Sequence, residues 1–292
     1  MKADVISDVS DTARWAAHLR ALESERPQPL FRDPYARLLA GERGRLVAEG
    51  LPDGPLAWSL AVRTRSFDEL IVRAVRDHAA HTVLNLAAGL DTRPYRLTLP
   101  ASLRWIEVDQ ASIIEPKNAL LPRERASCQL ERVALDLRDV SARQALFSRI
   151  NRESSRVLVV TEGFLLYLDE AEVGALADDL HSGFPSALWL LELVSPDVLA
   201  QLQEHWGKPL AAHTPLQFAP AQGLAFFDQH GFVPLVERSL FDEAERFGRE
   251  MRAITLVRWL SLVVPSIKRG LSARRAQFRD AVVFALIQQR TD

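Results

Sequence analysis

The stretch LNLAAGLDTR, residues 84–93, decides the fold that this sequence predicts. It lies between an apolar run and a helical pattern, which is where a strand turns into a helix in an α/β protein. The small residues Ala87, Ala88 and Gly89 let a ligand approach the backbone closely. The first and third glycines of a dinucleotide-binding turn are missing, so the turn suits a ligand without a pyrophosphate. An ordinary tight turn is the alternative interpretation.

Short apolar runs alternate with helical patterns around this stretch. The runs cover residues 81–87, 104–109, 130–136, 156–162 and 187–194, and helical patterns cover 110–121, 140–150 and 169–183. Strands that alternate with helices of this length predict βαβ units and a parallel sheet. Two later runs, 232–240 and 281–289, are candidates for an antiparallel edge. We therefore predict the α/β class, with a doubly wound, Rossmann-like sheet of seven mostly parallel strands.

The first 80 residues have helical periodicity and no strand candidate. Helices are predicted over residues 11–25 and 58–80, and a short helix is predicted to start at Asp33-Pro34. We expect a helical N-terminal unit over residues 1–80 and a core over residues 81–292. The looser stretch at about 195–230 is expected to be an insertion after the fifth strand.

The composition is that of a soluble globular protein. The 292 residues are 48% hydrophobic and 25% charged, with a formal net charge of -2. This balance gives no bias toward nucleic acid or acidic lipid, and no apolar stretch approaches the ~20 residues that span a bilayer. The single cysteine, Cys128, excludes an internal disulfide and argues against a cysteine-built metal site. No signal peptide is visible, so we expect a cytoplasmic protein that uses no metal.

An acidic residue ends the second predicted strand. Asp109 lies twenty positions after Gly89 and can accept hydrogen bonds from both hydroxyls of a ribose. Glu107 is the alternative ligand, but the position at the carboxyl end of the strand favours Asp109. Enzymes with different nucleoside cofactors share this feature, so it predicts a nucleoside without saying which one.

Two more strand ends supply candidate ligands. Asp136 and Leu137 follow the third run, where an aspartate can accept from an adenine amino group and a leucine can pack on the ring. Glu162 ends the fourth run, beside the point where the strand order reverses in doubly wound sheets. It could contact an ammonium group or line the mouth of a substrate site. The alternative roles are a cap or solvated loop residue for Asp136 and a helix cap for Glu162.

These stretches resemble one protein family. The strings VLNLAAGLDTRPYRL (83–97), WIEVD (105–109), LDL (135–137) and VLVVTEGFLLYL (157–168) look like the leucine carboxyl methyltransferase and polyketide O-methyltransferase family. The family's bacterial branch of S-adenosylmethionine (SAM)-dependent methyltransferases is more similar still, and residues 11–41 and 62–70 also resemble it. The resemblance covers residues 11–194 well. It implies a class I methyltransferase fold, an N-terminal helical lid, and SAM as the cofactor.

The resemblance implies roles for the residues at the first three strand ends. Ala87 and Gly89 would line the methionine part of SAM. Asp109 would bind the ribose, and Asp136 with Leu137 would bind the adenine. The family's usual turn reads G-A-G-x-D-T, so Ala87 replaces the first glycine.

The resemblance also implies contacts for the charged ends of SAM. Glu162 would lie near the sulfonium and the methyl acceptor. Arg63 or Arg65 would bind the SAM carboxylate, and Arg65 matches the T-R-x-F-D pattern best.

The implied activity is transfer of a methyl group to a carboxylate or hydroxyl oxygen of a small organic substrate, for example a polyketide-like one. Such a transfer is an in-line displacement, so the protein must align the acceptor and exclude water. A hydroxyl acceptor must also lose a proton. Glu162, Tyr167 and His213 are the candidates for a catalytic role. No base is evident next to the cofactor motifs, which favours an acceptor that is already ionised.

Two other functions are consistent with a nucleoside site. A nicotinamide-dependent oxidoreductase is disfavoured by the missing glycines and by the lack of a Tyr-x-x-x-Lys pair, since Ala171 follows Tyr167 at that spacing. A non-catalytic SAM-binding module is disfavoured because the cofactor positions are retained. The sequence leaves the acceptor and the oligomeric state open.

Overall fold

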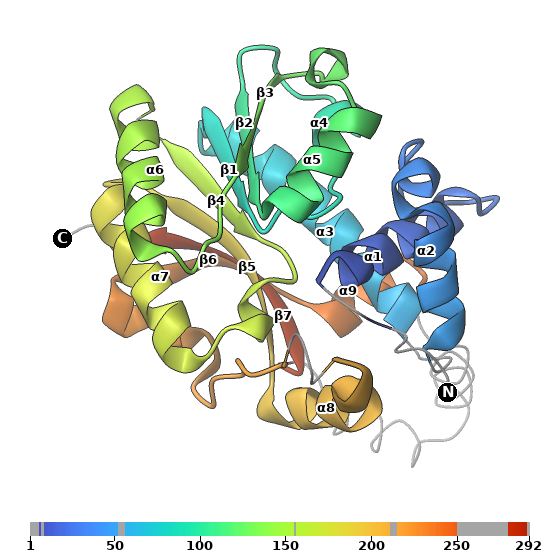
Figure 1. Ribbon diagram of the computed structural model, residues 1–292. Coiled ribbons are helices and arrows are strands. Elements are labelled where there is room, and N and C mark those ends of the chain that lie inside the picture. Colours follow the sequence, from blue (N-terminus) through green and yellow to red (C-terminus); the bar gives the residue numbers. More distant parts are fainter. Residues whose placement is uncertain are drawn as a thin grey trace.

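A seven-stranded sheet forms the centre of the computed structural model, which describes residues 6, 9–51, 56–154, 156–210, 215–249 and 280–290 (Figure 1). The strand order is β3-β2-β1-β4-β5-β7-β6. The strands are β1 (Thr82–Leu86), β2 (Arg104–Asp109), β3 (Gln129–Ala134), β4 (Val157–Thr161), β5 (Leu188–Val194), β6 (Phe232–Ser239) and β7 (Val282–Gln289). Each apolar run in the sequence forms one of these strands, so the predicted fold class is confirmed.

The sheet is parallel except at β7. β1 to β5 pair in parallel, whereas β7 lies between β5 and β6 and pairs antiparallel with both. β6 therefore points the same way as the first five strands, and only β7 supplies the antiparallel direction. β1 and β4 are neighbours although β2 and β3 come between them in the chain. This is the crossover point at which doubly wound sheets bind ligands.

Helices cover both faces of the sheet (Figure 1). The helices of the described residues are α1 (Val9–Ser24), α2 (Ala36–Gly50), α3 (Leu56–Asp77), α4 (Arg93–Arg96), α5 (Ala111–Leu120), α6 (Val140–Glu153), α7 (Glu170–Gly183), α8 (Pro196–Leu210) and α9 (Leu240–Arg246). The 3-10 turns are η1 (Arg123–Arg125), η2 (Leu165–Tyr167) and η3 (Gly223–His230). α2 begins at Ala36 rather than at the predicted Asp33-Pro34. Its helical geometry breaks at Gly41, where φ is +56°.

The sequence pattern of α3 sets its packing on the sheet. Phe67, Leu70, Ile71 and Ala74 recur every three or four residues and therefore share one helical face. All four are completely buried, and they pack with sheet residues such as Leu158 in one hydrophobic core. Alternate strand residues point to the opposite face, where they form a second core with α6 and α7.

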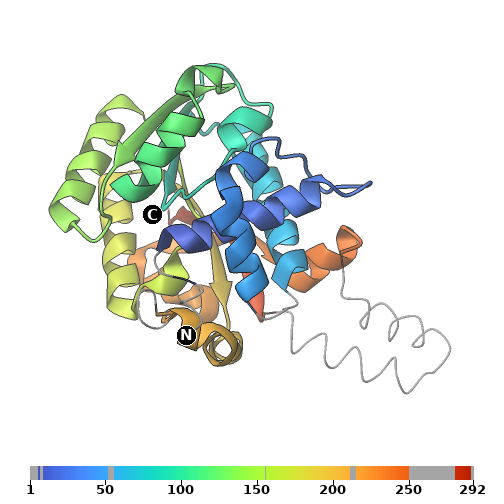
Figure 2. The same cartoon turned by 45° about the vertical axis from the view of Figure 1, so that its right-hand side comes forward.

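α1 and α2 pack on each other at the side of the sheet, as Figures 1 and 2 show from two directions. Their small core joins Ala17 of α1 and Leu39 of α2 to Leu90, which follows β1. α3 belongs instead to the layer on the sheet, so a domain boundary at residue 80 stays a prediction. α8 and η3 occupy the stretch expected as an insertion. No helix in the described ranges is long and apolar enough to cross a membrane.

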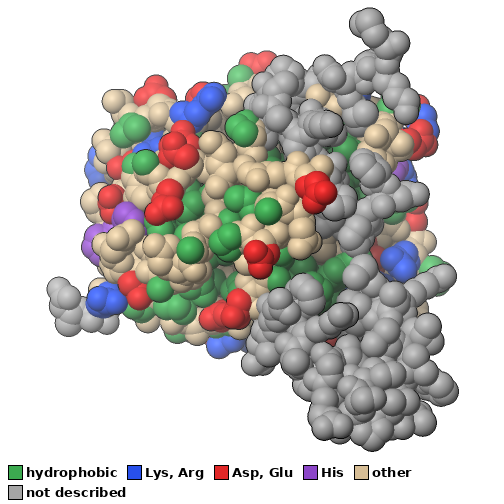
Figure 3. All heavy atoms as spheres, turned by 90° about the horizontal axis from the view of Figure 1, so that it is seen from below, with side chains coloured by type: hydrophobic (Ala, Val, Ile, Leu, Met, Phe, Trp, Pro, Cys, Tyr) green, Lys and Arg blue, Asp and Glu red, His purple; other side chains and the backbone are tan. Residues whose placement is uncertain are grey.

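Charged side chains are scattered over the face that is seen from below in Figure 3. In the part of this face that described residues form, acidic and basic side chains lie among hydrophobic ones. Nucleic-acid-binding proteins gather lysine and arginine into a patch or stripe. The described part of this face shows no such patch.

Arg93, the first residue of α4, joins three parts of the fold. Its side chain is 3% exposed and donates from Nε to Asp68 of α3 at 2.7 Å. Its Nη1 donates to Asp91 at 3.0 Å and to Glu162, just after β4, at 2.6 Å. Arg96 donates to both oxygens of Asp68 at 2.6 and 2.7 Å. A buried guanidinium needs compensating carboxylates, so these pairs fix α3 and α4 against the end of β4.

We expect Asp68→Asn to lower the free energy of unfolding by about 3 kcal/mol, because two buried guanidinium groups lose their shared counter-charge. Urea denaturation followed by circular dichroism measures this change. Asp77→Asn is the control on the same helix. Asp77 pairs with the exposed Arg76, so its replacement should leave stability nearly unchanged. Equal effects of the two substitutions would show that the buried network contributes no special stability.

Candidate active site

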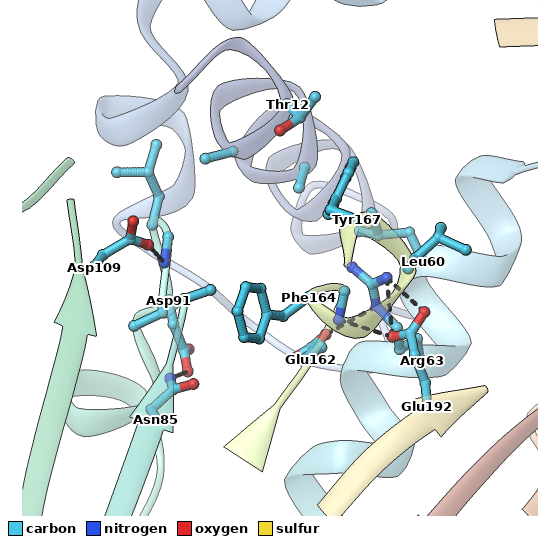
Figure 4. A pocket seen from close by; sticks show the side chains of 18 of the residues that line it. Thr12, Leu60, Arg63, Asn85, Asp91, Asp109, Glu162, Phe164, Tyr167 and Glu192 are labelled. Atoms are coloured by element: carbon cyan, nitrogen blue, oxygen red, sulfur yellow. Dashed lines mark hydrogen bonds and ion pairs between the residues drawn. The ribbon is translucent and has the colours of Figure 1, made fainter. Parts of the chain in front are cut away.

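A cavity of about 730 Å³ opens at the carboxyl ends of the parallel strands. Its walls come from the loops after β1 to β4, from β5 and β7, and from α1, α3 and α8. Figure 4 shows Asp109 on one side of it and Arg63 with Glu192 on the other. Six of the seven predicted cofactor-binding residues line this cavity: Ala87, Gly89, Asp109, Asp136, Leu137 and Glu162.

The turn after β1 is held from two sides. Gly89 donates its N–H to Asp109 Oδ2 at 2.7 Å, and its carbonyl oxygen accepts from Lys117 Nζ at 3.0 Å. The φ angle is +51° at both Ala87 and Gly89, a left-handed conformation that suits glycine and strains alanine. The backbone of this turn is therefore fixed where it forms the cavity wall.

Asp109, the last residue of β2, lines the cavity and is 9% exposed. Its second oxygen accepts from the N–H of Gln110 at 2.7 Å. Burial raises the pKa of Asp109, and the two backbone donors offset only part of this rise. Glu107 is fully buried and pairs with Lys117 at 2.9 Å and Arg132 at 2.8 Å. Of these two acids of β2, Glu107 therefore belongs to the core and Asp109 lines the cavity.

Asp136 and Leu137 follow β3 rather than ending it, because β3 stops at Ala134. Asp136 is 46% exposed and pairs with Arg138 at 2.8 Å. The hydrogen bond from Arg138 lowers the pKa of Asp136, so this carboxylate is ionised at neutral pH. Leu137 is buried beside it and offers an apolar surface at this end of the cavity.

Glu162 follows β4 at the crossover point and binds two guanidinium groups. Its Oε2 accepts from Arg93 Nη1 at 2.6 Å, and its Oε1 accepts from Arg63 Nε at 3.0 Å. Burial alone would raise the pKa of Glu162, but the charges of Arg93 and Arg63 outweigh it and hold the pKa below its usual value. Glu162 is thus a fixed negative charge in the cavity wall.

The structure places Arg63 in the cavity wall and Arg65 outside it. The side chain of Arg65 is 40% exposed and pairs with Glu69 at 3.2 Å, so its position does not fit the expected carboxylate-binding role. Side chains that are two positions apart on a helix, such as those of Arg63 and Arg65, point in directions about 200° apart. Only one of the two can therefore face the sheet. A sequence signal was present, because Arg63 lies four positions before Phe67 and therefore on the buried face of α3.

Glu192 on β5 is a cavity residue that the sequence analysis missed. Its side chain is 12% exposed and accepts from Arg63 Nη1 at 3.2 Å. It also accepts from the N–H of Gly163 at 3.2 Å. Glu192 is the charged residue in the strand sequence LWLLELV. A carboxylate in a buried strand needs a partner, so this single charge in an apolar run was a sequence signal for a buried polar site.

The three catalytic candidates are placed differently. Glu162 and Tyr167 line the cavity, whereas His213 lies outside the described residues. The Tyr167 side chain hydrogen-bonds Thr12 of α1, and burial raises the pKa of Tyr167, so its hydroxyl stays protonated at neutral pH. Among the residues that the structure describes, no group of three or more His, Cys, Asp or Glu is suited to a metal.

We expect Ala87→Gly to stabilise the protein by roughly 0.5 kcal/mol. A left-handed alanine costs roughly 1–2 kcal/mol, and the added chain entropy of glycine cancels about 0.4–1 kcal/mol of the gain. Ala88→Gly is the control, because Ala88 is buried but has no positive φ. It should destabilise by about 1 kcal/mol. Thermal unfolding measures both changes, and equal destabilisation by both would contradict the strain at Ala87.

Comparison with known proteins finds similar sequences. The profile of the family described as leucine carboxyl methyltransferase matches residues 13–181, more than half of the chain. A protein of Mycolicibacterium smegmatis is 36% identical over 195 residues, which cover 61% of this chain and 64% of the relative. One of Saccharopolyspora erythraea is 38% identical over 190 residues, which cover 60% and 63%. Both are provisionally named S-adenosyl-L-methionine-dependent methyltransferases, and each match spans less than two thirds of the relative.

Solved structures of low sequence identity share the fold. A DUF574 family protein from Streptomyces avermitilis has a TM-score of 0.61 at 13% identity, covering 96% of this chain and 97% of the other. A provisionally named methyltransferase from Thermobifida fusca has a TM-score of 0.60 at 12% identity, covering 99% and 96%. At these identities the likeness shows the fold alone, which is the class I methyltransferase fold.

Proposed function

Because the chain belongs to the leucine carboxyl methyltransferase family, we propose that it transfers a methyl group from SAM to an oxygen of a small organic acceptor. One observation carries this proposal. A continuous cavity at the crossover of the sheet presents polar groups suited to SAM along β1 to β4 and a largely apolar wall along β5 and β7.

The polar side chains along β1 to β4 fit the chemical groups of SAM. A guanidinium (Arg63) and a carboxylate (Glu162) match the carboxylate and ammonium of the methionine part. Asp109 presents a carboxylate for the ribose hydroxyls, and Asp136 with Leu137 presents an acceptor and an apolar surface for the adenine. Nη2 of Arg63 makes no hydrogen bond within the described part of the chain, whereas Nε and Nη1 do. This leaves a donor for the cofactor carboxylate.

When bound, SAM supplies an electrophilic methyl carbon on a sulfonium. The chain itself needs only to align the acceptor with that carbon and to keep water out. Asp109 and Lys117 hold the N–H and the carbonyl of Gly89, and a backbone fixed by the protein's own contacts needs little reorganisation on binding. Residues of α1 line the cavity, and Thr12 of α1 hydrogen-bonds Tyr167.

The acceptor half of the cavity indicates a largely apolar molecule. Its lining includes Val194 of β5 with Val282 and Phe284 of β7. Leu60 of α3 and Leu202 of α8 line its sides. Apolar pockets with a few placed polar groups are typical small-molecule sites.

Calorimetry with SAM, S-adenosylhomocysteine and NAD tests the cofactor. We expect the two sulfur compounds to bind and NAD to give no heat, because the turn lacks the glycines of a pyrophosphate site. Incubation with methyl-labelled SAM and a panel of carboxylic acids and phenols tests the transfer. Binding of NAD but not SAM would refute the proposal, and binding of SAM without transfer would favour a non-catalytic role.

Replacement of the two arginines separates their roles. Arg63→Ala should weaken SAM binding by roughly 10- to 100-fold, because it removes a charge-assisted hydrogen bond worth about 1.5–3 kcal/mol. Arg65→Ala, the matched control from the same helix, should leave the dissociation constant unchanged. Circular dichroism checks that both variants fold. A larger loss in Arg65→Ala than in Arg63→Ala would overturn this assignment.

A further inference from the structure

Two carboxylates lie side by side in the cavity wall. Thr161 of β4 pairs with Leu191 of β5 in the parallel ladder, so the next residues, Glu162 and Glu192, follow in the same register. Arg63 lies between them, with Nε on Glu162 at 3.0 Å and Nη1 on Glu192 at 3.1 Å (Figure 4). On its other side Glu192 pairs with Phe284 of β7. Glu192 therefore stands at the border between the polar and the apolar half of the cavity.

The two carboxylates have different surroundings. Glu162 binds Arg63 and Arg93, whereas the partners of Glu192 among the described residues are Arg63 and the N–H of Gly163. Burial raises the pKa of Glu192, and Arg63 offsets only part of this rise, while the pKa of Glu162 is held low. Paired acids whose environments push their pKa values apart commonly take different roles, one as a fixed charge and one as a proton carrier.

Glu192 is also an acid with apolar strand neighbours. Its strand neighbours on the cavity side are Val194 and Phe284. Leu60 of α3 lines the cavity on the same side as Arg63 (Figure 4). Of the described residues, Tyr167 also lines this part of the cavity, and its hydroxyl stays protonated at neutral pH. Of the histidines whose side chains the structure describes, none lines the cavity.

We infer that Glu192 is the general base of the methyl transfer proposed above, and that the acceptor is a neutral, apolar alcohol or phenol. Geometry supports this, because a carboxylate has about four acceptor positions and Glu192 accepts two hydrogen bonds from described residues, one from Arg63 Nη1 and one from the N–H of Gly163. About two acceptor positions remain, and an O–H group needs one of them. Among the described residues Arg63 is the one cation that pairs with Glu192, so a carboxylate acceptor would bring a second negative charge beside Glu192, which is unfavourable.

The reaction transfers a proton to Glu192 and a methyl group to the acceptor oxygen. The acceptor O–H bond breaks, and its proton goes to a Glu192 oxygen. The oxygen forms a bond to the methyl carbon, the carbon–sulfur bond breaks, and its electron pair stays on sulfur. The products are a methyl ether, S-adenosylhomocysteine and protonated Glu192, which returns its proton to water after release.

The test compares Glu192→Gln with the wild type on two acceptors at mildly alkaline pH. 2-Naphthol is neutral there and needs a base, whereas 4-nitrophenol is already ionised. Glu192→Gln should lower the rate with 2-naphthol by about 100-fold or more, in line with the contribution of general bases. The rate with 4-nitrophenol and the affinity for SAM should stay nearly unchanged. Glu237→Gln, an exposed glutamate on β6, is the matched control and should behave like the wild type.

The contrary outcomes are distinct. An equal loss with both acceptors, or a loss of SAM binding, would make Glu192 a structural or cofactor residue and overturn the inference. If the wild type binds SAM but methylates only carboxylic acids, the inference is also overturned. The same holds if the wild type binds SAM and transfers the methyl group to neither phenol. Failure of the wild type to bind SAM would instead refute the proposed function itself.

Discussion

The buried charge of Arg93 is the constraint on which the cavity depends. A guanidinium that has lost its water must meet carboxylates, because no single pair repays the cost of desolvation. Asp68 comes from α3, Asp91 from the turn after β1, and Glu162 from the end of β4. These segments are distant in sequence, and one side chain brings them to one place. The position of the cavity wall and the ionised state of Glu162 both follow from this pairing.

A second buried group supports the opposite side of the cavity. Glu107 lies within β2 and pairs with Lys117 and Arg132, and Lys117 also holds the carbonyl of Gly89. The N–H of the same glycine is held by Asp109. The core and the turn at Gly89 are therefore connected through a few polar contacts, which fix the backbone of the turn. Such preorganisation lowers the cost of binding.

The arrangement of polar and apolar side chains in the cavity changes which kind of methyl acceptor we propose. The sequence motifs contain no evident base, which favoured an acceptor that is already ionised. The structure places Glu192 one strand away from Glu162 and in register with it. These residues are thirty positions apart in the chain. Only the pairing of β4 with β5 makes them neighbours, and that pairing is the basis for proposing a hydroxyl acceptor.

The sequence by itself determined the strands, the turn at Gly89 and the strand-end residues Asp109 and Glu162. It could do so because short buried runs mark strands, and the carboxyl ends of parallel strands meet at one edge. Only the tertiary structure decided that Arg63 rather than Arg65 faces the cavity, and that Glu192 belongs to it. The rotation of a helix about its axis and the neighbours of a strand depend on packing between distant segments, which a local pattern does not contain.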